Sequence, residues 1–188
     1  MHSLVIFASG SGTNAQAIIN YFKTSGKARV SLIVCNNPGA GVLLRAEKEG
    51  IPTLMIGKES IYGEEFLETL KTHNPTLIVL AGFLWKVPDA VIQAFPSKII
   101  NIHPALLPKY GGKGMYGDNV HKAVIAAGEQ ESGITIHYVD EVYDRGAKIL
   151  QAYCKTDNED TVANLAQKIH LLEHFYYPRT IEYLLDNI

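Results

Sequence analysis

The chain of 188 residues has little of what marks a secreted or membrane protein. Its two cysteines, Cys35 and Cys154, are too few for a disulfide framework, and both fall in apolar runs where buried strand residues are expected. No apolar run reaches the length that spans a membrane, and Met1-His2-Ser3 leads directly into a predicted strand. We therefore expect a cytoplasmic protein with reduced thiols and no membrane partner.

An excess of charge of one sign is also missing. The chain has 17 basic and 19 acidic residues, and its lysines and arginines form no cluster of the kind that tracks nucleic acid. Pro/Ser-rich linkers, repeats and low-complexity segments are absent too. The sequence thus predicts one domain, residues 1–188, that acts on small molecules without a nucleic-acid partner, as a monomer or homodimer.

What the first half does contain is an alternation of short apolar runs with segments of helical period. The apolar runs, which predict strands, are residues 4–8, 30–35, 53–56, 77–81 and 98–102. The helical segments between them are residues 14–23, 42–49, 63–73 and 88–95. This alternation predicts an α/β fold of Rossmann-like type, a doubly wound, mostly parallel sheet with helices on both faces.

The pattern changes after His103, where a glycine-rich segment, residues 111–114, follows. The remaining predicted elements are a short helix, residues 120–127, and a long final helix, residues 161–185. Between them lie two strands, residues 133–139 and 147–153, joined by a polar turn, residues 140–146. The two strands form a C-terminal antiparallel pair. We therefore expect a phosphate- or nucleotide-binding half, residues 1–100, and a catalytic half, residues 101–188.

A glycine turn joins the first predicted strand to the first predicted helix. Gly10-Ser11-Gly12-Thr13-Asn14-Ala15 fits the relaxed dinucleotide-binding pattern G-x-G-x-x-A. A nicotinamide site also needs an acidic residue at the end of the second strand, where this chain has Asn36-Asn37, so we expect no nicotinamide. Backbone N–H groups and the helix macrodipole at such a turn favour a phosphate monoester. The alternative is an ordinary turn in which Thr13 or Asn14 caps the helix.

Asn101 and His103 carry the clearest chemical signal. They lie two residues apart at the end of a β-branched run, so they share one face of a strand while Ile102 points into the core. Pro104 biases His103 toward an extended conformation and ends the strand at its carboxyl end, where open α/β sheets build their sites. With the carboxylate of Asp144, these side chains are the parts of an acyl-transfer site. Taken singly, each is equally an ordinary hydrogen-bonding residue.

These segments also resemble a known family. The chain is similar to the folate-dependent formyltransferases, in the same order and over essentially the whole length. The similar segments are residues 8–14, residues 81–84, residues 101–110 with Leu106-Leu107-Pro108, and Asp144. The resemblance is strongest to the branch that formylates 5'-phosphoribosylglycinamide (GAR). It implies the formyltransferase fold and transfer of a formyl group from 10-formyltetrahydrofolate, a cosubstrate, to the GAR amine, a step of purine synthesis.

The resemblance also implies three groups of site residues. The catalytic residues are Asn101, His103 and Asp144. GAR is bound through the backbone at Gly12, Thr13 and Asn14 and through the side chain of Glu173. The folate lies near Leu84, Trp85, Val87, Asp140 and Asp144. Trp85 departs from the family, which often has Arg there, but a main-chain contact survives that change.

Other functions share some of these residues. A 10-formyltetrahydrofolate hydrolase has the same catalytic trio but usually carries an extra N-terminal domain, for which we expect no room in this chain. A formyltransferase with another amine acceptor and a non-catalytic nucleotide-binding module are the further alternatives. His170-Leu171-Leu172-Glu173-His174 matches the zinc-peptidase pattern H-x-x-E-H, but such a site needs another ligand further along the chain, so we expect no metal.

The sequence leaves four further positions open. His137 alternates with Ile136 and Tyr138, and it either borders the site or is structural. His121, at the start of a predicted helix, is structural or peripheral. Tyr110 and Lys113 lie in or beside the glycine-rich segment, which either moves over bound substrate or forms an ordinary surface loop.

Overall fold

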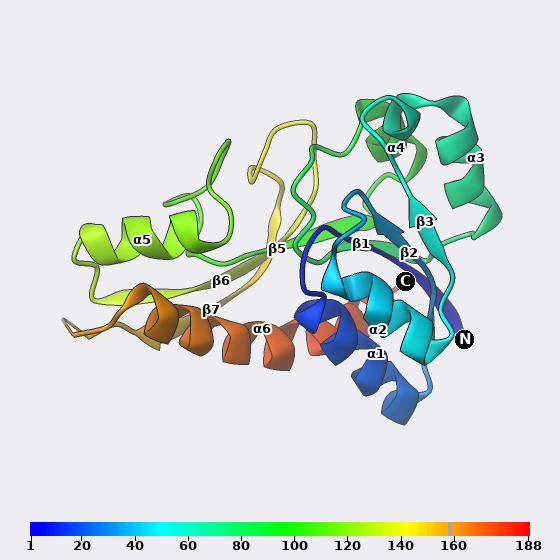
Figure 1. The fold of residues 1–188 in the computed structure, drawn as a ribbon. Coiled ribbons are helices and arrows are strands. Elements are labelled where there is room, and N and C mark those ends of the chain that lie inside the picture. Colours follow the sequence, from blue (N-terminus) through cyan, green and yellow to red (C-terminus); the bar gives the residue numbers. More distant parts are fainter. Residues whose placement is uncertain (158) are drawn as a thin grey trace.

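A computed structural model, which describes residues 1–157 and 159–188, is built on one seven-stranded sheet (Figure 1). The strands are β1 (His2–Ala8), β2 (Ala28–Cys35), β3 (Thr53–Met55), β4 (Leu77–Leu80), β5 (Ile99–His103), β6 (Glu131–Tyr138) and β7 (Lys148–Lys155). Their order is β3-β2-β1-β4-β5-β6-β7; β1 to β5 pair in parallel, whereas β6 and β7 are antiparallel to their neighbours. The predicted mostly parallel sheet with a C-terminal antiparallel pair is confirmed.

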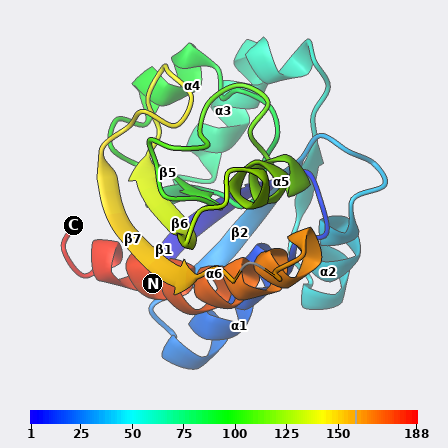
Figure 2. The same cartoon turned by 90° about the vertical axis from the view of Figure 1, so that its left-hand side faces the viewer.

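Helices cover both faces of this sheet (Figure 2). They are α1 (Thr13–Ser25), α2 (Gly41–Glu49), α3 (Glu64–Thr72), α4 (Asp89–Ala94), α5 (Asp118–Ala126) and α6 (Val162–Leu185), with a short 3₁₀ helix η1 (Ser60–Tyr62) before α3. One core contains residues of α1, α2, α5 and α6, and the other contains residues of η1, α3 and α4. The predicted elements are present within two residues of their predicted bounds, whereas η1 had no sequence signal.

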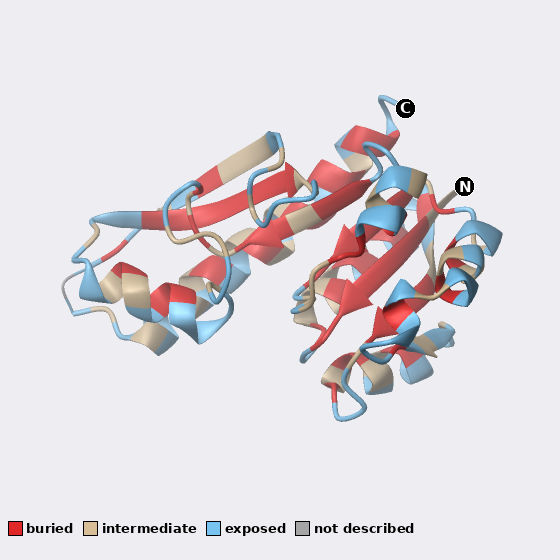
Figure 3. Cartoon of the chain, turned by 90° about the horizontal axis from the view of Figure 1, so that it is seen from above, coloured by how far each residue is buried: buried red, intermediate tan, exposed pale blue. Residues whose placement is uncertain are grey.

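Alternate strand residues fill the two cores. On β1, Leu4 and Ile6 belong to the core with α1 and α6, whereas Val5 and Phe7 belong to the core with α3 and α4. All four side chains are fully buried, and Figure 3 shows the central strands in the colour of buried residues. Each such burial contributes about 1.5–3 kcal/mol, so the central strands hold their carboxyl ends firmly in place.

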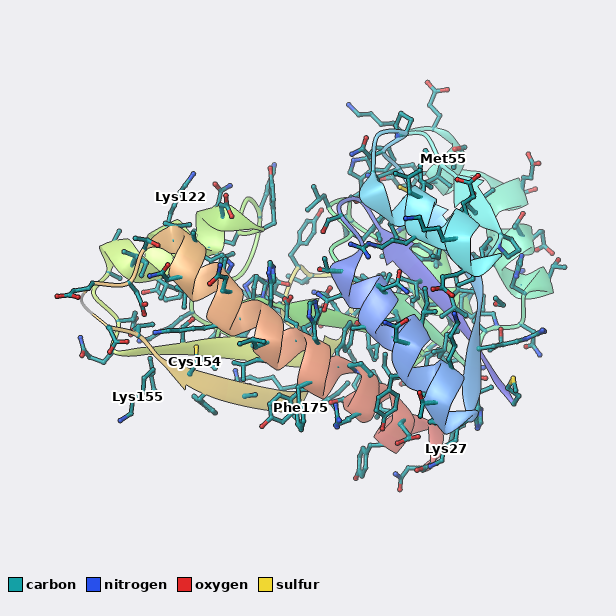
Figure 4. All side chains as sticks on the ribbon, turned by 60° about the horizontal axis from the view of Figure 1, so that its bottom comes forward. Lys27, Met55, Lys122, Cys154, Lys155 and Phe175 are labelled. Carbon is teal, nitrogen blue, oxygen red and sulfur yellow. The ribbon has the colours of Figure 1, made fainter. Side chains whose placement is uncertain are left out.

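Helix α6 runs along the sheet and connects the central strands to the antiparallel pair (Figures 1 and 4). It begins at a side-chain cap, where the Thr161 hydroxyl accepts the N–H of Asn164 at 3.1 Å. Further along, the fully buried Tyr177 donates its hydroxyl to the carbonyl oxygen of Leu80 at 2.9 Å and lies 3.3 Å from that of Ile100. These contacts fix α6 against β4 and β5.

Both cysteines are strand residues, as predicted. Cys35 ends β2 and is buried, and Cys154 is half-buried on β7, where Figure 4 labels it beside α6. Within the two described ranges, no helix combines the length and the apolar character needed to cross a membrane.

Candidate active site

The carboxyl ends of β1, β4 and β5 open into a cavity of about 620 Å³. The sequence-predicted site residues all line it: Gly12, Thr13, Asn14, Leu84, Trp85, Val87, Asn101, His103, Asp140, Asp144 and Glu173. They come from both halves of the chain, because the parallel strands of the first half and the turn between β6 and β7 meet at the same edge of the sheet. The cavity therefore joins the glycine turn, the β5 end and an apolar wall.

The turn between β1 and α1 depends on glycine at position 12. Gly12 has φ 75°, and a Cβ there would lie 2.7 Å from the Cα of Val42, so a side chain would meet fixed backbone. Gly12 is also the residue that precedes the first helical position, so the alternative in which Thr13 or Asn14 caps the helix is wrong. Among the described residues no side chain caps α1, and the first N–H groups of the helix have no intrahelical partner.

Asn14 connects this turn to α6. Its Nδ2 donates to Oε2 of Glu173 at 2.9 Å, and Glu173 is only 6% exposed. Burial raises the pKa of Glu173, while the Asn14 hydrogen bond and the neighbouring His170 act in the opposite direction. His170 and Glu173 both line the cavity, whereas His174 stacks against His170 with the ring centroids 6.1 Å apart. The zinc-like motif therefore contributes two of its residues to the same cavity as the glycine turn.

Asn101 projects from β5 toward His137 of β6. The antiparallel ladder sets the two residues opposite each other. Ile102, which lies between Asn101 and His103 in the sequence, is buried in the core with α6, as alternation predicts. Nδ1 of His137 lies 2.8 Å from the carbonyl oxygen of Tyr138, which can only accept, so Nδ1 carries the proton. Nε2 of His137 lies 3.2 Å from Nδ2 of Asn101 and faces one hydrogen of that amide. One N–H of the Asn101 amide is thus held, and the other remains for the cavity.

His103 is held between a backbone carbonyl and a carboxylate. Its Nε2 lies 2.7 Å from the carbonyl oxygen of Tyr110, so Nε2 carries a proton, and its Nδ1 lies 3.7 Å from Oδ2 of Asp144. Burial lowers the pKa of His103, outweighing the Asp144 carboxylate and the Tyr110 carbonyl, while His137 lowers it further. The imidazole is therefore neutral at pH 7, with an unprotonated Nδ1 on the side of Asp144.

Asp144 is positioned by the loop between β6 and β7. Its Oδ2 accepts the N–H of Gly112 at 2.8 Å, and its Oδ1 lies 3.6 Å from Nε2 of His137. Burial raises its pKa, but the two imidazoles and the Gly112 N–H together hold the pKa below its ordinary range. Gly146 lets this loop close, because a Cβ there would lie 1.7 Å from a backbone carbonyl oxygen of β6. Asp144 is thus an ionised carboxylate facing two histidines.

The end of the cavity beyond β4 is apolar. Trp85 packs edge-on against Phe83 with the ring centroids 6.5 Å apart, and Val87 is buried beside them. Leu84 is 48% exposed, and its N–H donates to the hydroxyl of Ser9 at 2.9 Å. A cavity wall of apolar side chains with a few backbone polar groups suits a flat heterocyclic ring.

Comparison with known proteins agrees with this geometry. The family described as "Formyl transferase" matches residues 2–181. This chain belongs to the formyl transferase family. It is 39% identical to phosphoribosylglycinamide formyltransferase of Bacillus subtilis, and the alignment covers 98% of this chain and 95% of the relative.

A second sequence relative and a solved structure are similar to this formyl transferase over nearly its whole length. It is 37% identical to the trifunctional purine biosynthetic protein adenosine-3 of Drosophila melanogaster, over 97% of the chain but only 14% of that much longer protein. The crystal structure of phosphoribosylglycinamide formyltransferase from Anaplasma phagocytophilum superposes with a TM-score of 0.90 at 33% identity, over 98% of this chain and 87% of that one. The whole chain thus corresponds to a segment that recurs both alone and within a larger protein.

Three histidines line the formyl transferase cavity although the sequence did not assign them to it: His121, His137 and His170. His137, left open between two roles, lies opposite Asn101 only because β5 and β6 pair in this register. His121, predicted to be structural or peripheral, is 3% exposed, and its Nδ1 has no hydrogen-bond partner among the described residues. His170 reaches the cavity through the docking of α6. Strand register and helix docking are long-range features, so the alternation along β6 and the H-x-x-E-H motif drew attention to His137 and His170 without deciding that either lines the cavity.

Proposed function

We propose that this chain transfers a formyl group from 10-formyltetrahydrofolate to the amine of GAR, releasing tetrahydrofolate and formylglycinamide ribonucleotide in purine synthesis. The observation that carries the proposal is the convergence of Asn101, His103 and Asp144 in a cavity between a phosphate-type turn and an apolar wall. Relatives named phosphoribosylglycinamide formyltransferase support the formyl group and the acceptor in this proposal. We further propose that the chain acts in the cytoplasm as a single domain, as a monomer or homodimer.

The proposed place for GAR is the end of the cavity formed by the glycine turn. The N–H groups of Thr13 and Asn14 begin α1, where the macrodipole and unpaired donors favour a phosphate dianion. Gly12 lets the turn pack directly against Val42 of α2, where a Cβ would lie 2.7 Å from the Val42 Cα, and this packing holds the turn in place. Glu173 lies within hydrogen-bonding distance of Asn14 on the opposite wall, which suits an acceptor for ribose hydroxyls.

The proposed place for the folate is the apolar end of the cavity. Leu84, Trp85 and Val87 would cover the faces of the pterin. Backbone N–H and carbonyl groups near them would form hydrogen bonds with its polar edge. Asp140 also lines the cavity, in the loop that carries Asp144. With both substrates in these places, the GAR amine and the formyl carbon meet beside Asn101 and His103, and proximity supplies much of the rate.

In the proposed mechanism the GAR amine attacks the formyl carbon and a tetrahedral oxyanion forms. The free N–H of Asn101 donates to this oxyanion, and the unprotonated Nδ1 of His103 accepts the proton of the attacking nitrogen. The resulting imidazolium faces the ionised Asp144 at 3.7 Å. The proton then passes to the folate nitrogen as its bond to the formyl carbon breaks. One C–N bond forms, another breaks, and no electron is transferred, so the reaction needs neither metal nor nicotinamide.

The decisive experiment follows tetrahydrofolate release by absorbance, with and without GAR. We expect release that depends on GAR, that disappears in His103→Ala, and that persists in His73→Ala, a control outside the cavity at the end of α3. Release without GAR would identify a hydrolase instead. No release from folded protein with GAR, but release with another amine, would identify another acceptor. Binding of GAR with no release under any condition would identify a binding module.

A further inference from the structure

The carbonyl that contacts His103 belongs to a residue that is held from outside the cavity. Tyr110 has φ 56°, in the left-handed region that is uncommon for residues with large side chains. Its hydroxyl donates to Oε1 of Glu129 at 2.8 Å. Neither Tyr110 nor Glu129 is among the residues that line the cavity. The residue whose carbonyl faces His103 is therefore hydrogen-bonded to a carboxylate that does not line the cavity.

Glu129 is itself well anchored. Its carboxylate accepts from Nζ of Lys109 at 2.8 and 3.2 Å, its N–H donates to the carbonyl oxygen of Val124 at 3.4 Å, and its carbonyl oxygen accepts the Thr156 hydroxyl. The hydrogen bonds from Lys109 and Tyr110 lower the pKa of Glu129, so the carboxylate is ionised at pH 7. Glu129 thus ties the segment after β5 to the end of α5 and to the segment after β7.

We propose that Glu129 is a positioning residue, which holds the Tyr110 side chain so that the Tyr110 carbonyl stays at Nε2 of His103 and Nδ1 stays unprotonated. The catalytic part of this inference rests on the proposed function, because it assigns proton transfer to Nδ1. The structural part does not, because the tautomer of His103 is a property of the protein without substrates.

The reasoning follows from the two positions that the His103 proton can take. When Nε2 donates to the Tyr110 carbonyl, Nδ1 offers a lone pair to the cavity. When that carbonyl moves away, Nε2 loses its acceptor, and the proton gains a better partner at Nδ1, because the Asp144 carboxylate lies 3.7 Å from it. Nδ1 is then already protonated and cannot accept the proton of the attacking amine.

Loss of the Glu129 anchor should also move the pH profile. The titratable groups that face His103 are Asp144 from the β6–β7 loop, His137 from β6 and His121 from α5, and the variants below leave all three in place. The Tyr110 carbonyl acts to raise the His103 pKa against the effect of burial. Without it, the pKa falls further, and the rising limb of kcat moves to lower pH.

The test uses a matched set of variants of the whole chain. Tyr110→Phe removes only the hydroxyl, and Glu129→Ala removes the acceptor. Glu129→Gln keeps an acceptor for the hydroxyl and serves as the rescue. Lys109→Met removes the ion pair and leaves the Tyr110–Glu129 hydrogen bond, so it is the control. NMR of the imidazole nitrogens reports the His103 tautomer without substrates, and steady-state kinetics give kcat, KM and their pH profiles.

We expect Tyr110→Phe and Glu129→Ala to populate the Nδ1-protonated tautomer of His103 and to lower kcat by roughly tenfold. This loss is smaller than the whole rate enhancement that general acid–base catalysis contributes. KM for GAR should stay near the wild-type value. Glu129→Gln and Lys109→Met should retain the wild-type tautomer and pH profile, and the double variant Tyr110→Phe/Glu129→Ala should be no slower than either single variant.

An unchanged tautomer and an unchanged pH profile in Tyr110→Phe would overturn the proposal. So would a lower melting temperature of Glu129→Ala with the His103 signals unaltered, since Glu129 would then be only structural. Failure of the proposed function is distinguishable, because wild-type protein would release no tetrahydrofolate while the tautomer still responded to these variants.

Discussion

Replacing Asn101 by alanine removes the donor that we assign to the oxyanion. The Asn101 side chain is half-buried at the cavity, and one N–H is already held by His137 at 3.2 Å, so the other is preorganised. A preorganised donor of this kind contributes about 3 kcal/mol to the transition state, which corresponds to a loss of roughly 150-fold in kcat. KM for GAR and for the folate should change by less than about threefold, because the oxyanion exists only after attack.

The assay is GAR-dependent release of tetrahydrofolate under saturating substrates. Asn101→Asp has the same shape but no N–H, and it adds a second carboxylate beside Asp144, so it should be at least as slow as Asn101→Ala. Asn20→Ala, on the exposed face of α1, is the control and should retain wild-type kcat. The reasoning is refuted if Asn101→Ala keeps more than about a third of the wild-type kcat, or if the loss appears only in KM.

Three other perturbations test separate parts of the structure. Gly12→Val should raise KM for GAR by at least about tenfold, because its Cβ would lie 2.7 Å from the Cα of Val42 and distort the turn; an unaltered KM in steady-state kinetics would contradict the phosphate assignment. The kcat of the wild-type protein should rise with pH through a pKa below 6.5, because His103 accepts a proton only when neutral and burial lowers its pKa; a rising limb centred above 6.5 would exclude this role. Tyr177→Phe should lower the free energy of unfolding by about 1 kcal/mol in urea denaturation, because the Leu80 carbonyl loses a buried donor; an unchanged midpoint would show that the hydrogen bond does not stabilise α6 against the sheet.

The sequence was most informative where the relevant physics is local. The alternation along β5 put Asn101 and His103 on one face and Ile102 in the core, because strand side chains alternate whatever the rest of the fold does. The alternation of strands and helices likewise predicted the parallel sheet, since parallel neighbours need crossover connections. The glycine turn was located correctly, whereas the alternative of a cap at Thr13 or Asn14 could be excluded only from the backbone, which makes Gly12 the N-cap.

The surroundings of the site depended on contacts between distant segments. Asp144 and Glu173 were assigned to the site through resemblance, since nothing local separates Asp144 from an ordinary turn residue. The hydrogen-bond partner of Asn101 is set by the β5–β6 register. The partner of His103 is the backbone carbonyl of Tyr110, and because every residue has a backbone carbonyl, the residue types give no indication of this contact. His121 and His170 reach the cavity because α5 and α6 dock where they do.

The sequence by itself therefore determined the order of the elements, the strand end that carries the amide and the imidazole, and the family. Only the tertiary structure decided the protonation of that imidazole. The proton position depends on which groups face the two ring nitrogens, and these are the Tyr110 carbonyl and the Asp144 carboxylate, from two different loops. Burial then lowers the pKa of His103, and burial is a property of the assembled layers rather than of any segment of the chain.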